Sequence, residues 1–227
     1  DDEVKCGAVM EREKRLQGIV FLGGRFDYTP ADLAMLNVPF VCCSYSNRYG
    51  TLIEGEYSSV SIADGDTAQQ AVEELYRHGH RRIAALISRP DDQSISQLRY
   101  EGYVQALESH GIPVDTELVI STGGFGAKDA YRAVQEKMAE NVDFTALFAI
   151  ADSMAIGAMR ALMDAGRRIP EDCSVIAIDG LELSAYIEPP LTTLCQPMEE
   201  MGRRSAEILL DMVRHKGSHA CELLHTT

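Results

Sequence analysis

The chain has 227 residues, of which 45% are apolar and 25% are charged, and this composition is that of a globular domain large enough to bury a core. Fibrous, mini-protein and wholly disordered classes are therefore excluded, and no apolar run reaches the roughly 18 residues of a membrane-spanning helix. The 21 basic residues minus the 35 acidic residues give a net charge of −14. Because this charge repels phosphate backbones, we expect no DNA binding by this chain alone.

The cysteine pattern indicates a reducing, cytoplasmic compartment. The six cysteines form no C-x-x-C pair and have no histidine partner at zinc spacing. Cys42 and Cys43 sit in an apolar, strand-like run, where a thiol behaves as a small hydrophobic side chain. Residues 1–3 are acidic, whereas a secretory signal begins with a basic stretch.

Short apolar runs alternate along the chain with segments of helical periodicity. The runs predict strands at 17–22, 38–43, 58–62, 82–87, 118–121, 145–150, 174–178, 192–195 and 220–225. The intervening segments predict helices at 2–15, 30–36, 66–78, 95–110, 127–139, 152–165, 183–187 and 198–214. Such alternation is typical of βα units, so we predict an α/β fold with doubly wound parallel sheets, divided into two lobes.

The chemistry of common enzymes and metal sites is missing from the sequence. There is no G-x-S-x-G, no H-E-x-x-H and no G-x-x-x-x-G-K-[ST]. His78 and His80 flank a glycine that ends a helix, and they face opposite ways in an extended segment. We therefore expect no catalytic residue, no metal and no cofactor.

Four stretches resemble the effector-binding core of bacterial LacI/GalR-type transcription regulators. They are Leu75 to Ile83 (L-x-x-x-G-H-x-x-I), Arg99 to Tyr103 (R-x-x-G-Y), Asp152 to Asp172 (D-x-M-A-x-G followed by I-P-x-D), and Ile178 to Gly202 with its P-L-T-T-L-x-Q-P run. The resemblance spans about residues 15–227. It implies a type I periplasmic-binding-protein-like fold.

The resemblance also implies how the chain is divided. The N-terminal lobe would comprise 1–78 and 197–216, and the C-terminal lobe 79–196 and 217–227. Family cores begin with a strand, a helix and a second strand before the point that matches Asp1, and a DNA-binding helix-turn-helix precedes those. Either the chain is therefore a fragment of a longer protein or its N-terminal lobe is incomplete. Operator DNA would be bound only through a headpiece absent from this chain.

The resemblance implies a small, sugar-like effector at the carboxyl ends of the strands, between the lobes. Arg99 and Asp179 are the strongest candidates, because a guanidinium and a carboxylate bind neighbouring hydroxyls from the donor and acceptor sides. An ion pair between elements is the alternative for both. Effector binding would close the lobes and so move the headpieces on DNA.

Further effector contacts are predicted with an alternative role for each residue. Phe125 either stacks on the ligand or plugs the core, and Gln196 either binds the ligand or fixes a hinge. Asp66 and Asp152 are helix caps that could also reach the pocket. The last candidate is Ser44. Sugar-binding relatives commonly have a pair of polar residues at the positions that Ser44 and Tyr45 occupy here.

Ala151 likewise replaces a common asparagine. These departures favour a less hydroxylated or more aromatic effector, or a different sugar pose.

A regulator that binds paired half-sites presents two headpieces, so we expect a homodimer. By resemblance, the interface would include Met154, Met159, Tyr186 and Ile187. Two other classes stay open. A solute-binding protein of a sugar transport system uses the same lobes, and an enzyme is not excluded by fold alone.

Overall fold

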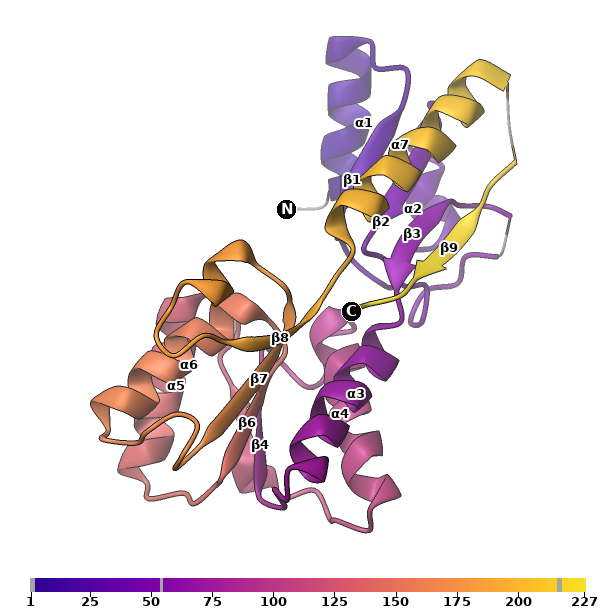
Figure 1. The fold of residues 1–227 in the computed structure, drawn as a ribbon. Helices are drawn as coiled ribbons and strands as arrows, with labels where there is room; N and C mark the ends of the chain where they lie inside the picture. Colours follow the sequence, from indigo (N-terminus) through magenta and orange to yellow (C-terminus); the bar gives the residue numbers. More distant parts are fainter. Residues whose placement is uncertain (1–2, 54, 216–217) are drawn as a thin grey trace. The chain divides into compact units, whose positions relative to one another are not determined.

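In the computed structural model, residues 3–53, 55–215 and 218–227 are described, and the chain divides into two units. Unit 1 comprises Asp1–Ala63, Gln93–Ile95 and Pro197–His225, and unit 2 comprises Asp64–Asp92, Ser96–Gln196 and Thr226–Thr227. Figure 1 shows their elements. Three predicted boundaries lie outside the described residues. They are position 2, where the first helix was expected to begin, and positions 216 and 217, where one lobe segment was expected to end and another to start.

Unit 1 is built on a parallel sheet in the order β1-β2-β3-β9. Its strands are β1 (Ile19–Leu22), β2 (Phe40–Cys43), β3 (Ser59–Ile62) and β9 (Cys221–Leu224), and its helices are α1 (Glu3–Lys14), α2 (Pro30–Leu33) and α7 (Met198–His215). The α7 stripe of Met201, Ile208 and Met212 packs on Val41 and Val60 of the sheet. Seven- and four-residue spacings place these side chains on one helical face.

Unit 2 is built on a parallel sheet in the order β5-β4-β6-β7-β8. Its strands are β4 (Ile83–Ile87), β5 (Val119–Ser121), β6 (Ala146–Ala149), β7 (Ser174–Asp179) and β8 (Thr192–Cys195). Its helices are α3 (Asp64–Arg77), α4 (Ile95–Ser109), α5 (Ala127–Ala139) and α6 (Asp152–Asp164), with 3-10 turns η1 (Thr116–Leu118) and η2 (Glu182–Ala185). The central strands β4 and β6 are wholly buried, as expected for a parallel sheet with helices on both faces.

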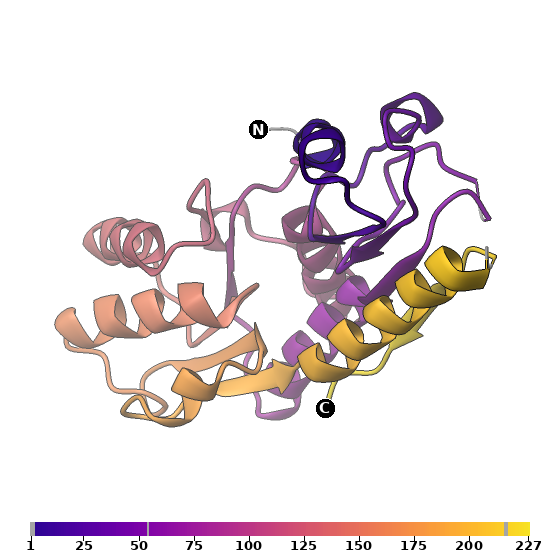
Figure 2. The same ribbon diagram turned by 90° about the horizontal axis from the view of Figure 1, so that it is seen from above.

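The two views of unit 2 agree on its layers. Helices α3 and α4 lie on one face of the sheet, and α5 and α6 lie on the other (Figures 1 and 2). The predicted α/β fold with doubly wound parallel sheets is confirmed. No helix within the described residues is both long enough and apolar enough to cross a bilayer.

Two predicted lobe boundaries differ from the units. Helix α3 was expected in the N-terminal lobe, but Ala68, Ala71 and Leu75 belong to the core of unit 2. Strand β9 was expected in the C-terminal lobe, but it pairs with β3, with Ser59 opposite Cys221. Of the last residues, only the final two join unit 2, where Thr227 exchanges backbone hydrogen bonds of 2.7 and 3.1 Å with Cys195.

Candidate functional site

Arg99, on the first turns of α4, is the centre of a buried polar cluster in unit 2. Its side chain is 2% exposed, and its Nε donates to Asp64 Oδ1 at 2.9 Å. Its Nη1 donates to the Ile150 carbonyl and to Asp179 Oδ1, the latter at 3.3 Å. The guanidinium therefore joins the start of α3, the end of β6 and the end of β7.

One nitrogen of Arg99 keeps unused hydrogen-bonding capacity. Nη2 lies 2.9 Å from Asp64 Oδ1, which is within ion-pair distance, but its N–H bonds do not point at that oxygen. Among the described residues, this buried nitrogen has no hydrogen-bond acceptor. Because Nη2 has an ion-pair contact but no aligned hydrogen bond among the described residues, a ligand oxygen here could accept a hydrogen bond that they do not supply.

A glycine brings the two helices close enough for Arg99 to reach Asp64. A Cβ at Gly102 would lie 2.1 Å from the carbonyl oxygen of Gly65, so only glycine allows α4 to approach the start of α3 this closely. Gly102 lies three residues after Arg99, and the R-x-x-G spacing therefore has a packing cause. The two residues of the motif act together to form the ion pair.

Asp179 ends β7 in an unusual backbone conformation, with φ at 142°. Gln196 holds it at two points: Nε2 donates to Asp179 Oδ1 at 2.7 Å, and the Gln196 N–H donates to the Asp179 carbonyl at 3.1 Å. Positive φ at a residue with a Cβ is costly and persists where surrounding contacts impose it. These contacts fix the carboxylate beside Arg99.

Charge in the cluster is unbalanced, because two carboxylates face one guanidinium. Burial raises the pKa of Asp64 and that of Asp179, while the nearby Arg99 opposes both shifts. Hydroxyl groups can donate to these carboxylates and accept from Nη2 of Arg99. The arrangement suits an uncharged ligand that carries both donors and acceptors.

Comparison with known proteins identifies the domain. Residues 72–227 match the family described as periplasmic binding protein-like domain. The chain belongs to this family. It is 35% identical to the HTH-type transcriptional regulator MalR of Clostridium butyricum, over all of this chain and 66% of MalR. It is 34% identical to the HTH-type transcriptional repressor CytR of Escherichia coli K12, over 93% of this chain and 62% of CytR.

Solved structures of regulators in this family share the fold. A transcriptional regulator CelR–cellobiose complex superposes with a TM-score of 0.85 at 31% identity, over 99% of this chain and 68% of CelR. A LacI family transcriptional regulator from Enterococcus faecium, with bound ribose, gives 0.80 at 26% identity, over 100% of this chain and 82% of the other. The chain spans just under two thirds of the curated relatives MalR and CytR.

Asp152, the aspartate of the family's D-x-M-A-x-G motif, is buried and fully engaged. Its Oδ2 accepts from the Leu181 N–H at 2.8 Å and from Ser184 Oγ at 2.7 Å, and its Oδ1 accepts from Thr193 Oγ1 at 2.5 Å. The cap of α6 is Ala151, so the predicted cap role of Asp152 is wrong. Its carboxylate ties η2 and β8 to α6, which leaves little capacity for the predicted ligand contact.

The other predicted contacts are dispersed. Asp66 is exposed in the first turn of α3, which begins two residues earlier than predicted, so Asp66 is not its cap. Phe125 is 39% exposed in the loop before α5, where its carbonyl accepts from Ser153 Oγ at 2.8 Å. Ser44 follows β2 in unit 1 with φ at 58°. Within unit 2, direct hydrogen bonds join Arg99, Asp179 and Gln196.

The residue missed by the sequence analysis is Asp64. The run Asp64-Gly65-Asp66 contains two acidic residues that could cap the helix. Asp66 was predicted as the cap because it directly precedes Thr67 and the apolar positions of the helix. The signal for Asp64 was the glycine beside it, since a helix start that must accept a close neighbour needs a small residue.

Two of the four predicted interface residues are unsuited to an interface. Met154 and Met159 on α6 are 0% and 2% exposed and pack within the core of unit 2, so they cannot contact a second subunit. Tyr186 is 76% exposed, and Ile187 is partly buried against the core.

Helix α6 also packs closely against α5. A Cβ at Gly157 would lie 2.0 Å from the Ala127 carbonyl oxygen.

Proposed function

We propose that this chain is the effector-binding core of a LacI-type transcription regulator and that its effector binds Arg99 and Asp179. The observation that carries the proposal is Arg99 Nη2, a buried nitrogen that donates no hydrogen bond to any described residue. Beside it lie two carboxylates that can accept hydrogen bonds from ligand hydroxyls. The relatives support the regulatory role, since MalR and CytR are named transcriptional regulators. Their names also favour this function over the alternative, a solute-binding protein of a transport system.

The effector class that fits the cluster is an uncharged, sugar-like molecule. One hydroxyl would accept from Arg99 Nη2 while a neighbouring hydroxyl donates to Asp179, a pattern that replaces the hydration of a diol. Gln196 would hold Asp179 in place and offer its amide. The bound cellobiose and ribose of two structural relatives support this class. A phosphorylated sugar fits less well because two carboxylates already surround one guanidinium.

Signalling would run through segments that lie outside this chain in its longer relatives. The net charge of −14 opposes direct contact with operator DNA, so a separate basic headpiece would bind it. Effector binding would favour one arrangement of the two units over another, and the differential affinity would change the headpieces' hold on DNA. We place the protein in the cytoplasm, where its six free thiols stay reduced.

The test is isothermal titration calorimetry with cellobiose, ribose and glucose 6-phosphate. We expect at least one neutral sugar to bind and the phosphate ester to bind more weakly. Arg99→Lys keeps a charge opposite Asp64 but loses the planar fork, and should weaken binding at least tenfold. Arg160→Lys, whose side chain is exposed on α6, is the matched control and should bind as the wild type does.

Asp179→Asn keeps the shape of the side chain and should also weaken binding. Equal affinity of wild type, Arg99→Lys and Asp179→Asn for a sugar would remove this cluster from the binding site. Circular dichroism of each variant establishes that the fold is retained.

A further inference from the structure

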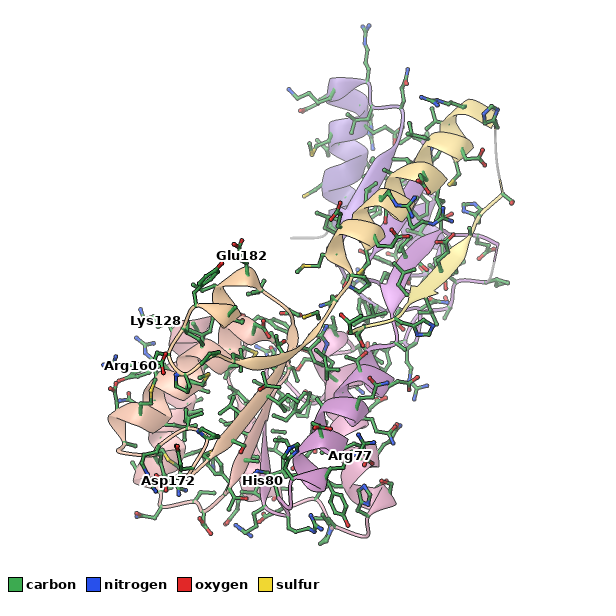
Figure 3. The ribbon with its side chains drawn as sticks, viewed as in Figure 1. Arg77, His80, Lys128, Arg160, Asp172 and Glu182 are labelled. Carbon is green, nitrogen blue, oxygen red and sulfur yellow. The ribbon has the colours of Figure 1, made fainter. Side chains whose placement is uncertain are left out.

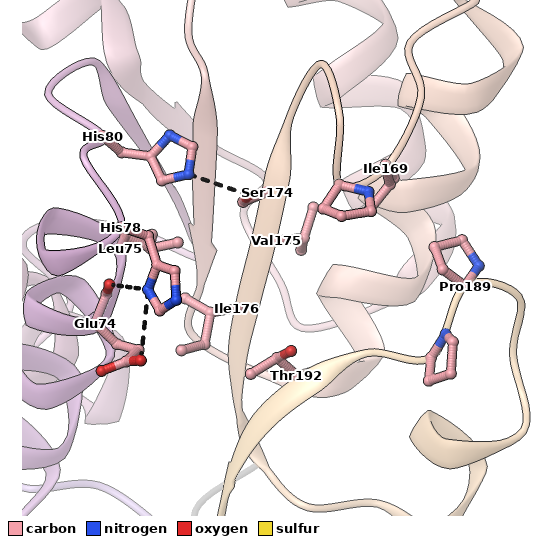
Figure 4. Close-up of a pocket in the computed structure, with 12 residues that line it drawn as sticks. Glu74, Leu75, His78, His80, Ile169, Ser174, Val175, Ile176, Pro189 and Thr192 are labelled. Atoms are coloured by element: carbon pink, nitrogen blue, oxygen red, sulfur yellow. Dashed lines mark hydrogen bonds and ion pairs between the residues drawn. The ribbon is translucent and has the colours of Figure 1, made fainter.

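A cavity of about 440 Å³ lies in unit 2, at the end of the sheet opposite Asp179 (Figure 4). It is bordered by the last turn of α3, the start of β7 and the segment that leads into β8. Because β7 runs from Ser174 at the cavity to Asp179, the two places are about 16 Å apart along the strand. In Figure 3, His80 and Asp172 mark this end of unit 2, and Glu182 marks the other. The volume is within the roughly 300–1,000 Å³ of small-molecule sites.

The cavity has one apolar and one polar wall. Ile169, Val175 and Pro189 supply aliphatic surface on one side, and His78 and His80 supply imidazole rings on the other (Figure 4). A flat ring compound would bury one face against the aliphatic groups and the other beside the imidazoles. The wall chemistry therefore favours a planar, mostly apolar ligand.

His80 is fixed and belongs to the frame of the cavity. Its Nδ1 lies 3.0 Å from Thr145 Oγ1 and its Nε2 lies 3.1 Å from Ser174 Oγ. Both ring nitrogens are thus occupied by hydroxyls at the starts of β6 and β7. Burial lowers the pKa of His80, with a smaller contribution from His78, which favours its neutral form.

His78 has one ring nitrogen left for a ligand. Its Nδ1 lies 2.9 Å from the Glu74 carbonyl oxygen, and since a carbonyl only accepts, Nδ1 carries the proton. The Glu74 carboxylate also lies near Nδ1, with Oε1 at 3.5 Å, so Nε2 is the ring nitrogen left for a ligand. Figure 4 shows Nε2 directed away from Glu74, toward Ile176 on β7. The cavity offers this nitrogen to a ligand N–H or O–H.

Charge narrows the ligand class further. Of the residues that border the cavity, all of which the structure describes, Glu74 is the only carboxylate residue and none is lysine or arginine. Glu74 Oε2 already lies 3.4 Å from Arg77 Nη1. Arg77 lies beside Glu74 but does not border the cavity, so the lining itself offers an anion no lysine or arginine, and the Glu74 carboxylate disfavours anions.

We propose that this cavity is a second ligand site of the domain, separate from the Arg99 cluster, for an uncharged planar ring compound with a hydrogen-bond donor. The ring packs against Ile169 and Val175, and its donor binds Nε2 of His78. This inference does not depend on the identity of the effector that binds Arg99.

The experiment is titration of the isotope-labelled 227-residue chain with indole, monitored by amide and methyl NMR. Benzofuran has the same shape without the N–H, and indole-3-carboxylate adds a negative charge. We expect indole to shift signals of Ile169, Val175 and His80, benzofuran to bind about three- to tenfold more weakly, and the carboxylate more weakly still. His78→Phe should weaken indole by a similar factor, whereas His215→Phe, on the exposed end of α7, should not.

Two variants keep the outcome clear. Ile169→Trp fills the cavity and should abolish the indole shifts while the rest of the spectrum is preserved, and Arg99→Lys should leave them unchanged. The proposal is overturned if indole shifts no signal at this cavity, or if its shifts centre on Asp64 and Asp179. Equal binding of indole and benzofuran to wild type and His78→Phe also overturns it.

Discussion

At the scale of single residues, two side chains of the family motifs differ in how much hydrogen-bonding capacity remains. Asp152 uses both oxygens on three donors of its own chain, whereas Arg99 keeps Nη2 without an acceptor. Both are buried and both match a motif, so neither burial nor sequence separates them. The number of donors or acceptors still available distinguishes the two residues, because a polar ligand needs free donors or acceptors in order to bind.

The role of Asp152 as a tie between elements leads to a stability prediction. Asp152→Ala leaves the Leu181 N–H, Ser184 Oγ and Thr193 Oγ1 without their acceptor and should lower the free energy of unfolding by about 3 kcal/mol. Urea denaturation followed by circular dichroism measures the change. Asp66→Ala, on an exposed position of the first helical turn, is the control and should cost less than about 1 kcal/mol. Equal losses in the two variants would contradict the assigned role.

His80 predicts a pH dependence of stability. Burial lowers its pKa in the folded protein below the ordinary value of 6.5, so the unfolded chain binds the proton more readily. Its contribution to stability is complete above pH 6.5 and decreases as the pH falls from there toward the folded pKa. We expect the loss of stability between pH 7.5 and 5.5, measured by urea midpoint, to be smaller in His80→Asn than in the wild type. A loss of the same size in both would show that His80 is not responsible.

At the scale of elements, helix contacts depend on individual glycines. Gly102→Ala places a methyl group 2.1 Å from the Gly65 carbonyl and must separate α3 from α4, which should cost at least about 2 kcal/mol and weaken effector binding with it. Gly202→Ala on α7 is the matched control, since no atom lies within 4 Å of its Cβ. Helix propensity alone should then stabilise the protein by up to about 1 kcal/mol. Thermal unfolding of both variants tests the pair, and the same sign of change in both would refute the packing argument.

The positions of the elements were predictable, because local periodicity determines them. Each predicted strand is present within about two residues of its expected ends, and Gly79, Gly111 and Gly166 follow the ends of α3, α4 and α6 with positive φ. The partner of a strand is not local information. The 220–225 run was correctly predicted as a strand, but its pairing with β3 depends on a segment about 160 residues earlier.

Part of the candidate site was predictable because its residues lie in local sequence motifs. Arg99, Asp179 and Gln196 lie in distinctive motifs and come together as expected, although their contact with a ligand stays a prediction. Asp64 was missed because its role follows from the approach of α4 to α3 at Gly102, and Gly65 beside it marks a close approach without naming the helix that approaches. Polar residues held by tertiary contacts are the least accessible to sequence analysis.

At the scale of the whole molecule, exposed large apolar side chains occur in both units, and three of the five in the described part of unit 2 lie on one short segment. Leu181, Leu183 and Tyr186 on and beside η2 are 37%, 57% and 76% exposed. Aromatic and aliphatic side chains so exposed within six residues are typical of surfaces that another subunit covers. A two-fold axis through such a segment would bring it against its own copy, the simplest way to cover it.

We therefore expect the chain to form a homodimer through the η2 segment, with Tyr186 and the adjacent Ile187 in the interface, whereas Met154 and Met159 stay in the core. Size-exclusion chromatography with light scattering should give twice the 25.0 kDa of one chain at about tens of micromolar. Tyr186→Asp combined with Leu183→Asp should give monomers, because each dimer would bury four unpaired carboxylates. Leu210→Asp replaces a leucine that is 46% exposed on α7 of unit 1, and it should leave the dimer intact. A wild-type monomer at this concentration, or loss of the dimer in Leu210→Asp alone, would assign the η2 side chains another role.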